Sequence, residues 1–553
     1  MPWQDSSDCG SPPDPGFPAG PRNGAAQRSG RSPLLARTPA IRLPCVSRAA
    51  AAGAVVASRR CWVDPSRRRV KRLASRLGTA RGTCTNRCVL AAVLMAVVAL
   101  AGAVPVGAQD KQRDDRLADD FAALLSRRDT PANTCMSVSV DGEQIIGHRD
   151  TVGMVPASLT KLATMTAAIE LMGADEQFVT TVAVRADDLA AVRDGVLHGD
   201  VYLIGGGDPV LATPRYMRRL HDERPFTDAD RLADAAMAAL SSRGVRGVDG
   251  AVVGDGSRYA DNERDYTAHE VTDPAEGASA EVWKQSYRTT NLVGPLGGLT
   301  LNDGYRHHRS NRRAHVRSPD PAQGAASIFD DLLEARGMVI RDRPRAGAAP
   351  GETDRVELAS ISSPPLGSIV GRIGRYSENT AAEMLLKEIG HRTVGSTRAR
   401  AVMGAAAVLW GALGEVAGEI GMADGSGLSV HNTMTCRAAV ALLERTQRGD
   451  PLFDSLAIAG RTGTLQRCSP SVARNSAELH PVHAKGGILN DVVAVAGRVN
   501  ARSGRQLAFA VISNAPLLIG RGSCPALRRI PITAAARFDP APLESTHADV
   551  SVK

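Results

Sequence analysis

The chain has 553 residues, enough for two or three domains with sizeable cores, and its 43% hydrophobic and 23% charged residues are ordinary for globular proteins and exclude wholesale disorder. The formal net charge of +9 comes from the first 108 residues, where 16 Lys and Arg face 4 Asp. The remainder carries a net charge of −3. Because the basic charge is confined to an N-terminal arm, the sequence argues against nucleic-acid binding.

Residues 1–87 form this arm, which is rich in Pro, Ala and Arg, and residues 88–108 follow it. The apolar run 88–104, with arginines before it and small residues after it, is typical of a secretory signal peptide and predicts cleavage after Ala108. An uncleaved membrane anchor is the alternative. The arm is longer than a normal n-region, which indicates an unusual cytoplasmic tail or a start placed too far upstream. We expect export to the cell envelope, with the protein secreted or anchored through residues 88–104.

Four of the nine cysteines follow the predicted cleavage site, namely Cys135, Cys436, Cys468 and Cys524. They allow up to two disulfides of unknown connectivity, and buried thiols are the alternative. No Cys-x-x-Cys or His-x-x-x-His pair appears, and the arginine-rich surroundings of His307 and His308 predict a solvated surface rather than a metal site.

The chain beyond the signal segment begins with ordinary elements. Residues 114–125 predict an amphipathic helix, and residues 134–148 predict two strands that turn at Asp141-Gly142. Pro156 then favours a helix start, and the apolar stripe after it predicts a buried helix of about 15 residues.

Ser158 and Lys161 form the only Ser-x-x-Lys in a chain that has seven lysines against 60 arginines. Three residues along a helix bring the lysine amine back to the serine at the helix N-terminus. A desolvated lysine can lose its proton and act as a base, which a guanidinium cannot. A surface lysine on an ordinary helix is the alternative, so the motif needs partners elsewhere.

Two later segments supply candidate partners. Ser377-Glu378-Asn379 stands just before a helix-like stretch at 380–389, where a plain N-cap is the alternative. Lys485-Gly486-Gly487 opens a strand-like run, 488–499, which a turn separates from 506–512, so the pattern predicts two antiparallel strands. A lysine at the head of a strand can bind a carboxylate, and the glycines let a substrate backbone come close. A simple turn before a strand is the alternative.

Together these segments resemble the Ser-x-x-Lys, Ser-x-Asn and Lys-Thr-Gly motifs of penicillin-binding proteins and serine β-lactamases. The long interval between Lys161 and Ser377 resembles the D-alanyl-D-alanine carboxypeptidase/endopeptidase family, the low-molecular-mass class C penicillin-binding proteins with domains inserted there. Other segments that resemble this family are 201–209, 253–259, 293–296, 424–429 and 463–465.

The resemblance implies an α/β fold with a split transpeptidase/β-lactamase-like domain, an antiparallel sheet with helices. Residues 112–180 and 355–535 would form the catalytic domain, 181–354 an inserted β-rich accessory region, and 536–553 a tail. Gly205-Gly206-Gly207 lacks the spacing of a phosphate loop and predicts a structural turn. The arginines between 306 and 317 predict a solvated loop, with contact to anionic wall polymer as the alternative.

The resemblance also implies a serine-type D-Ala-D-Ala carboxypeptidase/endopeptidase that acts on peptidoglycan stem peptides and is covalently acylated by β-lactams such as penicillin. Ser158 would be the nucleophile, Lys161 its base, and Ser377 the group that relays a proton to the departing D-alanine. No metal or organic cofactor is implied.

The resemblance also implies which residues near Ser158, Lys161 and Ser377 bind the substrate. Asn379 would hold the peptide, and Lys485 would attract the terminal carboxylate. Gly487 would let the substrate backbone approach, and the backbone N–H groups of Ile488 and Ser158 would form the oxyanion hole.

One departure stands out, because Lys-Thr-Gly is here Lys485-Gly486-Gly487. Loss of the threonine hydroxyl costs about 1.5 to 3 kcal/mol for one charge-assisted hydrogen bond. The alternative function is therefore a weakly active or inactive wall-binding or penicillin-binding protein with a structural or sensory role. A β-lactamase is less favoured because no water-activating group is found. The sequence also predicts that Gly486→Thr raises carboxypeptidase activity and that Lys387 lies on the surface.

Overall fold

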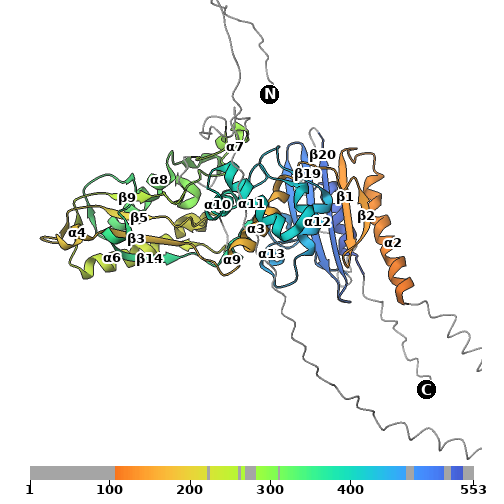
Figure 1. Cartoon of the computed structure of the whole chain (residues 1–553), viewed down its shortest axis with the longest axis horizontal. Coiled ribbons are helices and arrows are strands. Elements are labelled where there is room, and N and C mark those ends of the chain that lie inside the picture. The colour runs from red at the N-terminus through yellow and green to blue at the C-terminus, as the bar shows by residue number, and fades with distance from the viewer. Residues whose placement is uncertain are drawn as a thin grey trace, which may run out of the picture. The chain divides into compact units, whose positions relative to one another are not determined.

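The computed structural model describes residues 106–220, 224–259, 263–267, 282–308, 312–468, 479–515 and 525–539. The N-terminal arm, the apolar run 88–104, Cys524 and residues 540–553 of the expected tail lie outside the described residues. Figure 1 shows the described elements, which form a six-stranded sheet, a layer of helices on it and an inserted unit with a second sheet.

The six-stranded sheet is antiparallel and has the order β17-β18-β19-β20-β1-β2. Among the described strands the first, β1, pairs with the last, β20, from Thr134 opposite Ser513 to Val140 opposite Leu507. This sheet is therefore assembled from both ends of the described chain. The strands are β17 (Ala457–Ile458), β18 (His483–Leu489), β19 (Val492–Asn500), β20 (Gln506–Asn514), β1 (Thr134–Val140) and β2 (Glu143–His148).

The hairpin expected at 134–148 is confirmed as β1 and β2. The single strand expected over 488–499 is wrong, because a turn at Asn490 and Asp491 breaks it into the end of β18 and the whole of β19. Leu489 pairs with Val492 directly across this turn. Asn and Asp favour tight turns. The apolar residues on both sides of this pair led to the prediction of one continuous strand.

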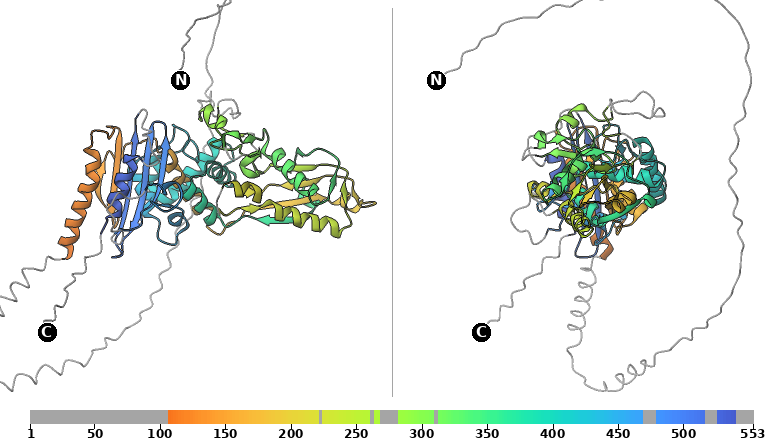
Figure 2. Two further views of the ribbon diagram at one scale, coloured as in Figure 1. Left: turned by 180° about the vertical axis from the view of Figure 1, so that it is seen from behind. Right: turned by 90° about the vertical axis from the view of Figure 1, so that its left-hand side faces the viewer.

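Helices cover both faces of the sheet. On one face α2 (Val106–Leu125) and α14 (Ala526–Ala536) bury apolar side chains against it, among them Phe121, whose ring lies 5.6 Å from that of Phe509. On the other face lie α3, α9, α10, α11 and α12, and Figures 1 and 2 show this layer between the sheet and the inserted unit. Burial of each large apolar side chain stabilises such layers by about 1.5 to 3 kcal/mol. Their bounds are α3 (Thr160–Met172), α9 (Leu366–Tyr376), α10 (Asn379–Arg392), α11 (Arg398–Leu413) and α12 (Cys436–Glu444).

The inserted unit has a five-stranded sheet of order β13-β9-β5-β3-β14, with α6 (Ala229–Ser242) and α8 (Pro321–Glu334) packed on it. Its strands β3 (Val179–Arg185) and β14 (Arg355–Ser362) pair along their length and stand where the chain enters and leaves the insertion. The other strands are β13 (Arg345–Ala346), β9 (Val252–Asp255) and β5 (Val201–Ile204).

Shorter elements complete the described chain. A three-stranded sheet has the order β12-β8-β4, and three further strand pairs are β6 with β7, β10 with β11 and β15 with β16. Their bounds, with those of the short helices, are β4 (Val196–Leu197), β6 (Leu211–Ala212), β7 (Thr227–Asp228), β8 (Gly247–Val248), β10 (Tyr305–His307), β11 (Val316–Arg317), β12 (Val339–Ile340), β15 (Ile420–Gly421), β16 (Thr433–Met434), α4 (Ala186–Ala190), α5 (Pro214–Arg219), α7 (Gln285–Thr289) and α13 (Pro451–Asp454).

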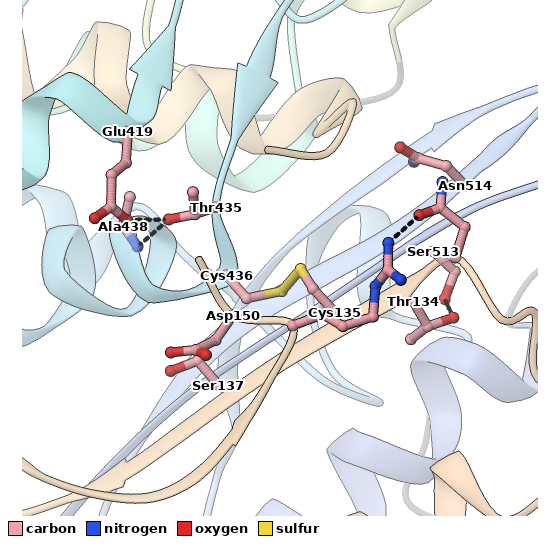
Figure 3. Close-up of a disulfide and its surroundings, with 12 residues drawn as sticks. Thr134, Cys135, Ser137, Asp150, Glu419, Thr435, Cys436, Ala438, Ser513 and Asn514 are labelled. Atoms are coloured by element: carbon pink, nitrogen blue, oxygen red, sulfur yellow. Dashed lines mark hydrogen bonds between the residues drawn. A yellow bond between two sulfur atoms is a disulfide. The ribbon is translucent and has the colours of Figure 1, made fainter. Parts of the chain in front are cut away.

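A disulfide between Cys135 and Cys436 ties β1 to the first residue of α12, with Cα atoms 6.0 Å apart (Figure 3). The N-cap of α12 is Thr435, whose hydroxyl accepts from the N–H of Ala438 at 3.0 Å and donates to Glu419. Cys468 is also disulfide-bonded. The bridge closes a loop that includes the whole insertion, so it limits the freedom of the unfolded chain.

Lys387 was expected on the surface, and this is wrong. It lies on the inner side of α10, fully buried, with its amine 3.5 Å from a carboxylate oxygen of Glu263 and 3.2 Å from the carbonyl oxygen of Ser396. Among the described residues, one helical stretch, Arg398–Glu419, is long and apolar enough to cross a membrane by length and composition, and it packs against α10 and α3.

Candidate active site

Ser158 lies in a short 3-10 turn, Ala157–Leu159, that leads directly into α3. The residue before it, Ala157, has φ of 48°, a left-handed conformation that a side chain disfavours and that turns the chain sharply at the nucleophile. Lys161 follows in the first turn of α3 and is fully buried, with Nζ 3.3 Å from Ser158 Oγ. The structure thus brings the two residues of the motif together as the sequence predicts.

The amine of Lys161 has three oxygen neighbours. It donates to Asn379 Oδ1 at 2.7 Å and to the carbonyl oxygen of Ser426 at 2.5 Å, and Ser158 Oγ is the most distant of the three. A neutral amine has two hydrogens and one lone pair. With both hydrogens engaged by oxygens that only accept, the lone pair is left for the one neighbour that can donate, the Ser158 hydroxyl.

Burial lowers the pKa of Lys161 to about 8, while Glu383 and Asp424 oppose this shift. Glu383 is itself fully buried on α10, and burial together with the nearby Asp424 raises its pKa to about 8. It accepts from the N–H of Gly425 at 3.0 Å and of Ser426 at 2.7 Å, so it holds the loop whose carbonyl receives the Lys161 amine.

Ser377 and Asn379 stand on either side of a helix junction. Ser377 ends α9 with φ of 59°, and Asn379 is the first residue of α10. Asn379 Nδ2 donates to the carbonyl oxygen of Leu292 at 2.8 Å, which directs Oδ1 toward Lys161. Glu378 precedes α10 without capping it, so the plain N-cap alternative does not describe this segment. Its carboxylate instead binds Arg224 and Arg372, each at 2.5 Å.

Lys485 on β18 reaches the second serine. Its Nζ donates to Ser377 Oγ and to the carbonyl oxygen of Gly486, each at 2.9 Å. Burial lowers the pKa of Lys485 well below its usual value, and Lys161 and Arg528 add to the effect because they are cationic. The site therefore contains two serine–lysine pairs, Ser158 with Lys161 and Ser377 with Lys485.

Gly487 lets β18 pass close to the nucleophile. A Cβ atom at this position would lie 2.7 Å from the carbonyl oxygen of Pro156 and 3.0 Å from the backbone nitrogen of Ser158. A side chain would therefore push the strand away. Ile488 comes next along β18, and its side chain is exposed.

A cavity of about 320 Å³ opens beside Ser377 and Asn379, and residues of the insertion, among them Tyr216, Asp303 and His308, complete its wall. His308, which was expected in a solvated loop, therefore lies in the wall of this cavity.

Sequence reasoning missed several residues of the site. Glu383 lies one helical turn after Asn379, a spacing that puts both on one face of α10, and this signal was available. Asp424 begins a segment noted only as family-like. It accepts from the N–H groups of Gly427 and Ser429 at 2.7 Å each. Its contact with Trp283 Nε1 at 2.8 Å spans 141 residues, and no local pattern predicts such a pairing.

Comparisons with known proteins find relatives over most of the chain. The curated D-alanyl-D-alanine carboxypeptidase of Actinomadura sp. (strain R39) is 29% identical over 475 residues, which cover 75% of this chain and 84% of that protein. Carboxypeptidase DacB of Mycolicibacterium smegmatis is 29% identical over 439 residues, covering 78% and 86%.

Among solved structures, penicillin binding protein 4 (dacB) from Haemophilus influenzae superposes with a TM-score of 0.55 at 18% identity and covers 76% of this chain and 97% of that one. This likeness confirms the expected α/β fold class. The profile of the D-Ala-D-Ala carboxypeptidase 3 (S13) family matches residues 127–291 and 296–525, which is more than half of the chain. With its motifs, fold and family profile in agreement, the chain belongs to the D-Ala-D-Ala carboxypeptidase 3 (S13) family.

Proposed function

We propose that the protein cleaves the terminal D-alanine, or a D-alanyl cross-link, from peptidoglycan stem peptides through an acyl-enzyme on Ser158, and that β-lactams acylate the same oxygen. The observation that carries the proposal is the buried amine of Lys161, which lies 3.3 Å from Ser158 Oγ and, in its neutral form, can accept the hydroxyl proton. The relatives' names support the substrate class.

Acylation begins when Ser158 Oγ attacks the carbonyl carbon of the penultimate D-alanine. Neutral Lys161 takes the hydroxyl proton as the new carbon–oxygen bond forms. The negative charge that develops on the carbonyl oxygen is stabilised by the backbone N–H groups of Ser158 and Ile488. The close passage of β18 at Gly487 supports this pairing of donors.

The second half of acylation breaks the peptide bond. Ser377 Oγ relays to the nitrogen of the departing D-alanine the proton that Lys161 accepted. Lys485, 2.9 Å from this oxygen, binds the terminal carboxylate, whose negative charge favours the protonated form of the buried amine. Asn379 holds the peptide in the cleft. Water then attacks the acyl-enzyme, which restores the Ser158 hydroxyl and releases the shortened peptide.

The replacement of threonine by Gly486 prompted the alternative of a penicillin-binding protein with little turnover. That alternative is not favoured, because Ser158, Lys161, Ser377 and Lys485 keep the contacts that acyl transfer requires.

The proposal is tested by D-alanine release from a pentapeptide that ends in D-Ala-D-Ala, measured with the full chain and with Ser158→Ala. We expect steady release by the wild type and none above background by the variant. Release by Ser158→Ala at the wild-type rate would refute the assignment of the nucleophile, and absence of release by the wild type would refute the turnover.

We also propose that the protein acts in the cell envelope, either secreted or anchored through residues 88–104. Its substrate class lies there, and the Cys135–Cys436 disulfide fits an oxidising compartment. Sequencing the mature N-terminus of exported protein would show cleavage after Ala108 or an intact anchor, whereas protein found only in the cytoplasm would contradict the proposal.

A further inference from the structure

Gly486, which stands where the family motif has threonine, faces the guanidinium group of Arg528. A Cβ atom placed on Gly486 would lie 2.7 Å from Nη2 and 2.8 Å from Cζ of Arg528. Non-bonded carbon and nitrogen atoms prefer separations of about 3.5 Å or more, so any side chain at this position would displace the guanidinium. An arginine from another part of the chain therefore occupies the place of the missing side chain.

Helix α14 holds Arg528 in this position. Arg528 lies in the first turn of the helix, and its Nε donates to the carbonyl oxygen of Ala494 on β19 at 3.1 Å. Ala494 pairs with Gly487 across β18 and β19, so this bond fixes the guanidinium beside the Lys-Gly-Gly segment. The neighbouring Leu527 is buried in the apolar layer between helix and sheet. The guanidinium is thus held in place before a ligand arrives, which lowers the entropic cost of binding.

Arg528 is also a buried cation. It is 5% exposed, and burial lowers the pKa of its guanidinium to about 10. Within the described ranges no carboxylate forms an ion pair with it, and its hydrogen bond there goes to a neutral carbonyl. A buried charge that lacks a counter-charge is unfavourable, and an incoming anion would relieve it. A second cationic group stands on the neighbouring residue of β18, where the amine of Lys485 donates to the carbonyl oxygen of Gly486 at 2.9 Å.

We propose that Arg528 binds the carboxylate of the substrate's terminal D-alanine, together with Lys485, in place of the hydroxyl of Lys-Thr-Gly. This inference rests on the proposed function and names a residue for its substrate recognition. A guanidinium has parallel N–H donors that match both oxygens of a carboxylate, which one hydroxyl does not. Lys485-Gly486-Gly487 is then an altered carboxylate site, and the carboxylate of penicillin binds there too.

The test compares the rates at which benzylpenicillin and its methyl ester, which lacks the carboxylate, acylate the full chain. Arg528→Met keeps the length of the side chain and removes the charge. We expect the rate with the acid to fall about ten- to a hundredfold, and the rate with the ester to stay unchanged. Arg528→Lys keeps a charge without the planar fork and should lose less. Arg529→Met, at an exposed position on the same helix, is the matched control and should behave as the wild type.

Gly486→Thr provides a second readout. Because the threonine displaces the guanidinium, the single variant Gly486→Thr should lose the preference for benzylpenicillin over its methyl ester. The sequence, by contrast, led us to expect that this substitution raises carboxypeptidase activity. Gly486→Thr combined with Arg528→Ala restores Lys-Thr-Gly without the clash, so it should recover part of the acid reactivity that Arg528→Ala loses.

The outcomes separate the two proposals. If neither compound acylates the wild type, the proposed function fails and this inference fails with it. If the wild type reacts and Arg528→Met keeps the same preference for the acid, or loses both rates equally, Arg528 does not bind the carboxylate and only holds α14 against the sheet. If Arg528→Met does not fold, the acid-to-ester ratios of Arg528→Lys and of the double variant decide by the same criterion.

Discussion

At the scale of single residues, the proposed chemistry depends on the protonation of Lys161. Two acceptor oxygens engage its hydrogens, and burial lowers its pKa to about 8. The protonated amine has no lone pair and cannot accept the Ser158 proton. Only the fraction of molecules with a neutral Lys161 is therefore competent for attack.

The pH dependence of acylation follows from this requirement. We expect the acylation rate constant with penicillin to be low well below pH 8, to rise through about pH 8 and to level off above it, as the neutral fraction grows. Lys161→Arg should abolish acylation because a guanidinium stays protonated, whereas Lys284→Arg at an exposed position should not change it. A rate independent of pH between 6 and about 9 would contradict the role of Lys161.

The residues that sequence alone located are those with a short-range pattern, since Ser158 and Lys161 are three positions apart on one helix. Lys485 was identified through its place at the head of a strand, and Ser377 through its place before a helix. Arg528 could not be found in this way, because its contact with Gly486 joins segments 42 residues apart through the packing of α14 on the sheet.

At the scale of elements, α10 links Lys161 to the backbone of Gly425 and Ser426. Asn379 at its first residue contacts Lys161, and Glu383 one turn later holds the backbone of Gly425 and Ser426. Glu383 does not touch the proposed substrate site, so we assign it a positioning role that acts through the Ser426 carbonyl.

Glu383→Gln tests this role. The amide replaces one acceptor oxygen by a donor that faces a backbone N–H, so we expect acylation to slow about tenfold or more, the cost of one buried unsatisfied donor. The pH midpoint should also move lower, because the ionised fraction of Glu383, which raises the pKa of Lys161, is gone. A purely structural defect would slow acylation without moving the midpoint. Glu415→Gln, at an exposed position, is the control.

The elements with a clear apolar period were predicted well, namely the helix over 114–125 and the hairpin over 134–148. The break between β18 and β19 was not, since apolar residues without an alternating pattern flank Asn490 and Asp491 on both sides. Periodicity cannot find the end of such a strand, and only the turn residues mark it.

At the scale of the whole molecule, buried charge joins the insertion to the catalytic domain. Glu388 on α10 is fully buried and accepts from Arg258 of the insertion at 2.6 and 2.9 Å. Arg392, one turn later, donates to the same carboxylate at 2.6 Å. Burial raises the pKa of the Glu388 carboxyl, but the bonds from Arg258 and Arg392 outweigh this effect, so the pKa lies below its usual value.

Glu388→Ala should destabilise this junction strongly. It leaves the partly buried guanidinium of Arg258 without its carboxylate partner and leaves Arg392 with Glu176 alone, so we expect the free energy of unfolding to fall by about 3 kcal/mol, measured by urea denaturation. Glu357→Ala, at an exposed position on β14, should change it by less than about 0.5 kcal/mol. Equal stability of the two variants would show that the ion pairs do not join the parts energetically.

The family resemblance, carried by three motifs in order, implied a split domain with an insertion in the long interval between Lys161 and Ser377. It did not predict the pairing of β3 with β14 or the helices α6 and α8 that give the insertion its own core. Those contacts are non-local, and their residues carry no motif.

The central claim, that Ser158 is the nucleophile, is tested most directly by mass spectrometry of the chain after exposure to penicillin. We expect the protein to gain the mass of one penicillin molecule, the modified peptide to contain Ser158, and Ser158→Ala to gain none. An adduct on another residue, or an adduct of equal yield on Ser158→Ala, would contradict the account.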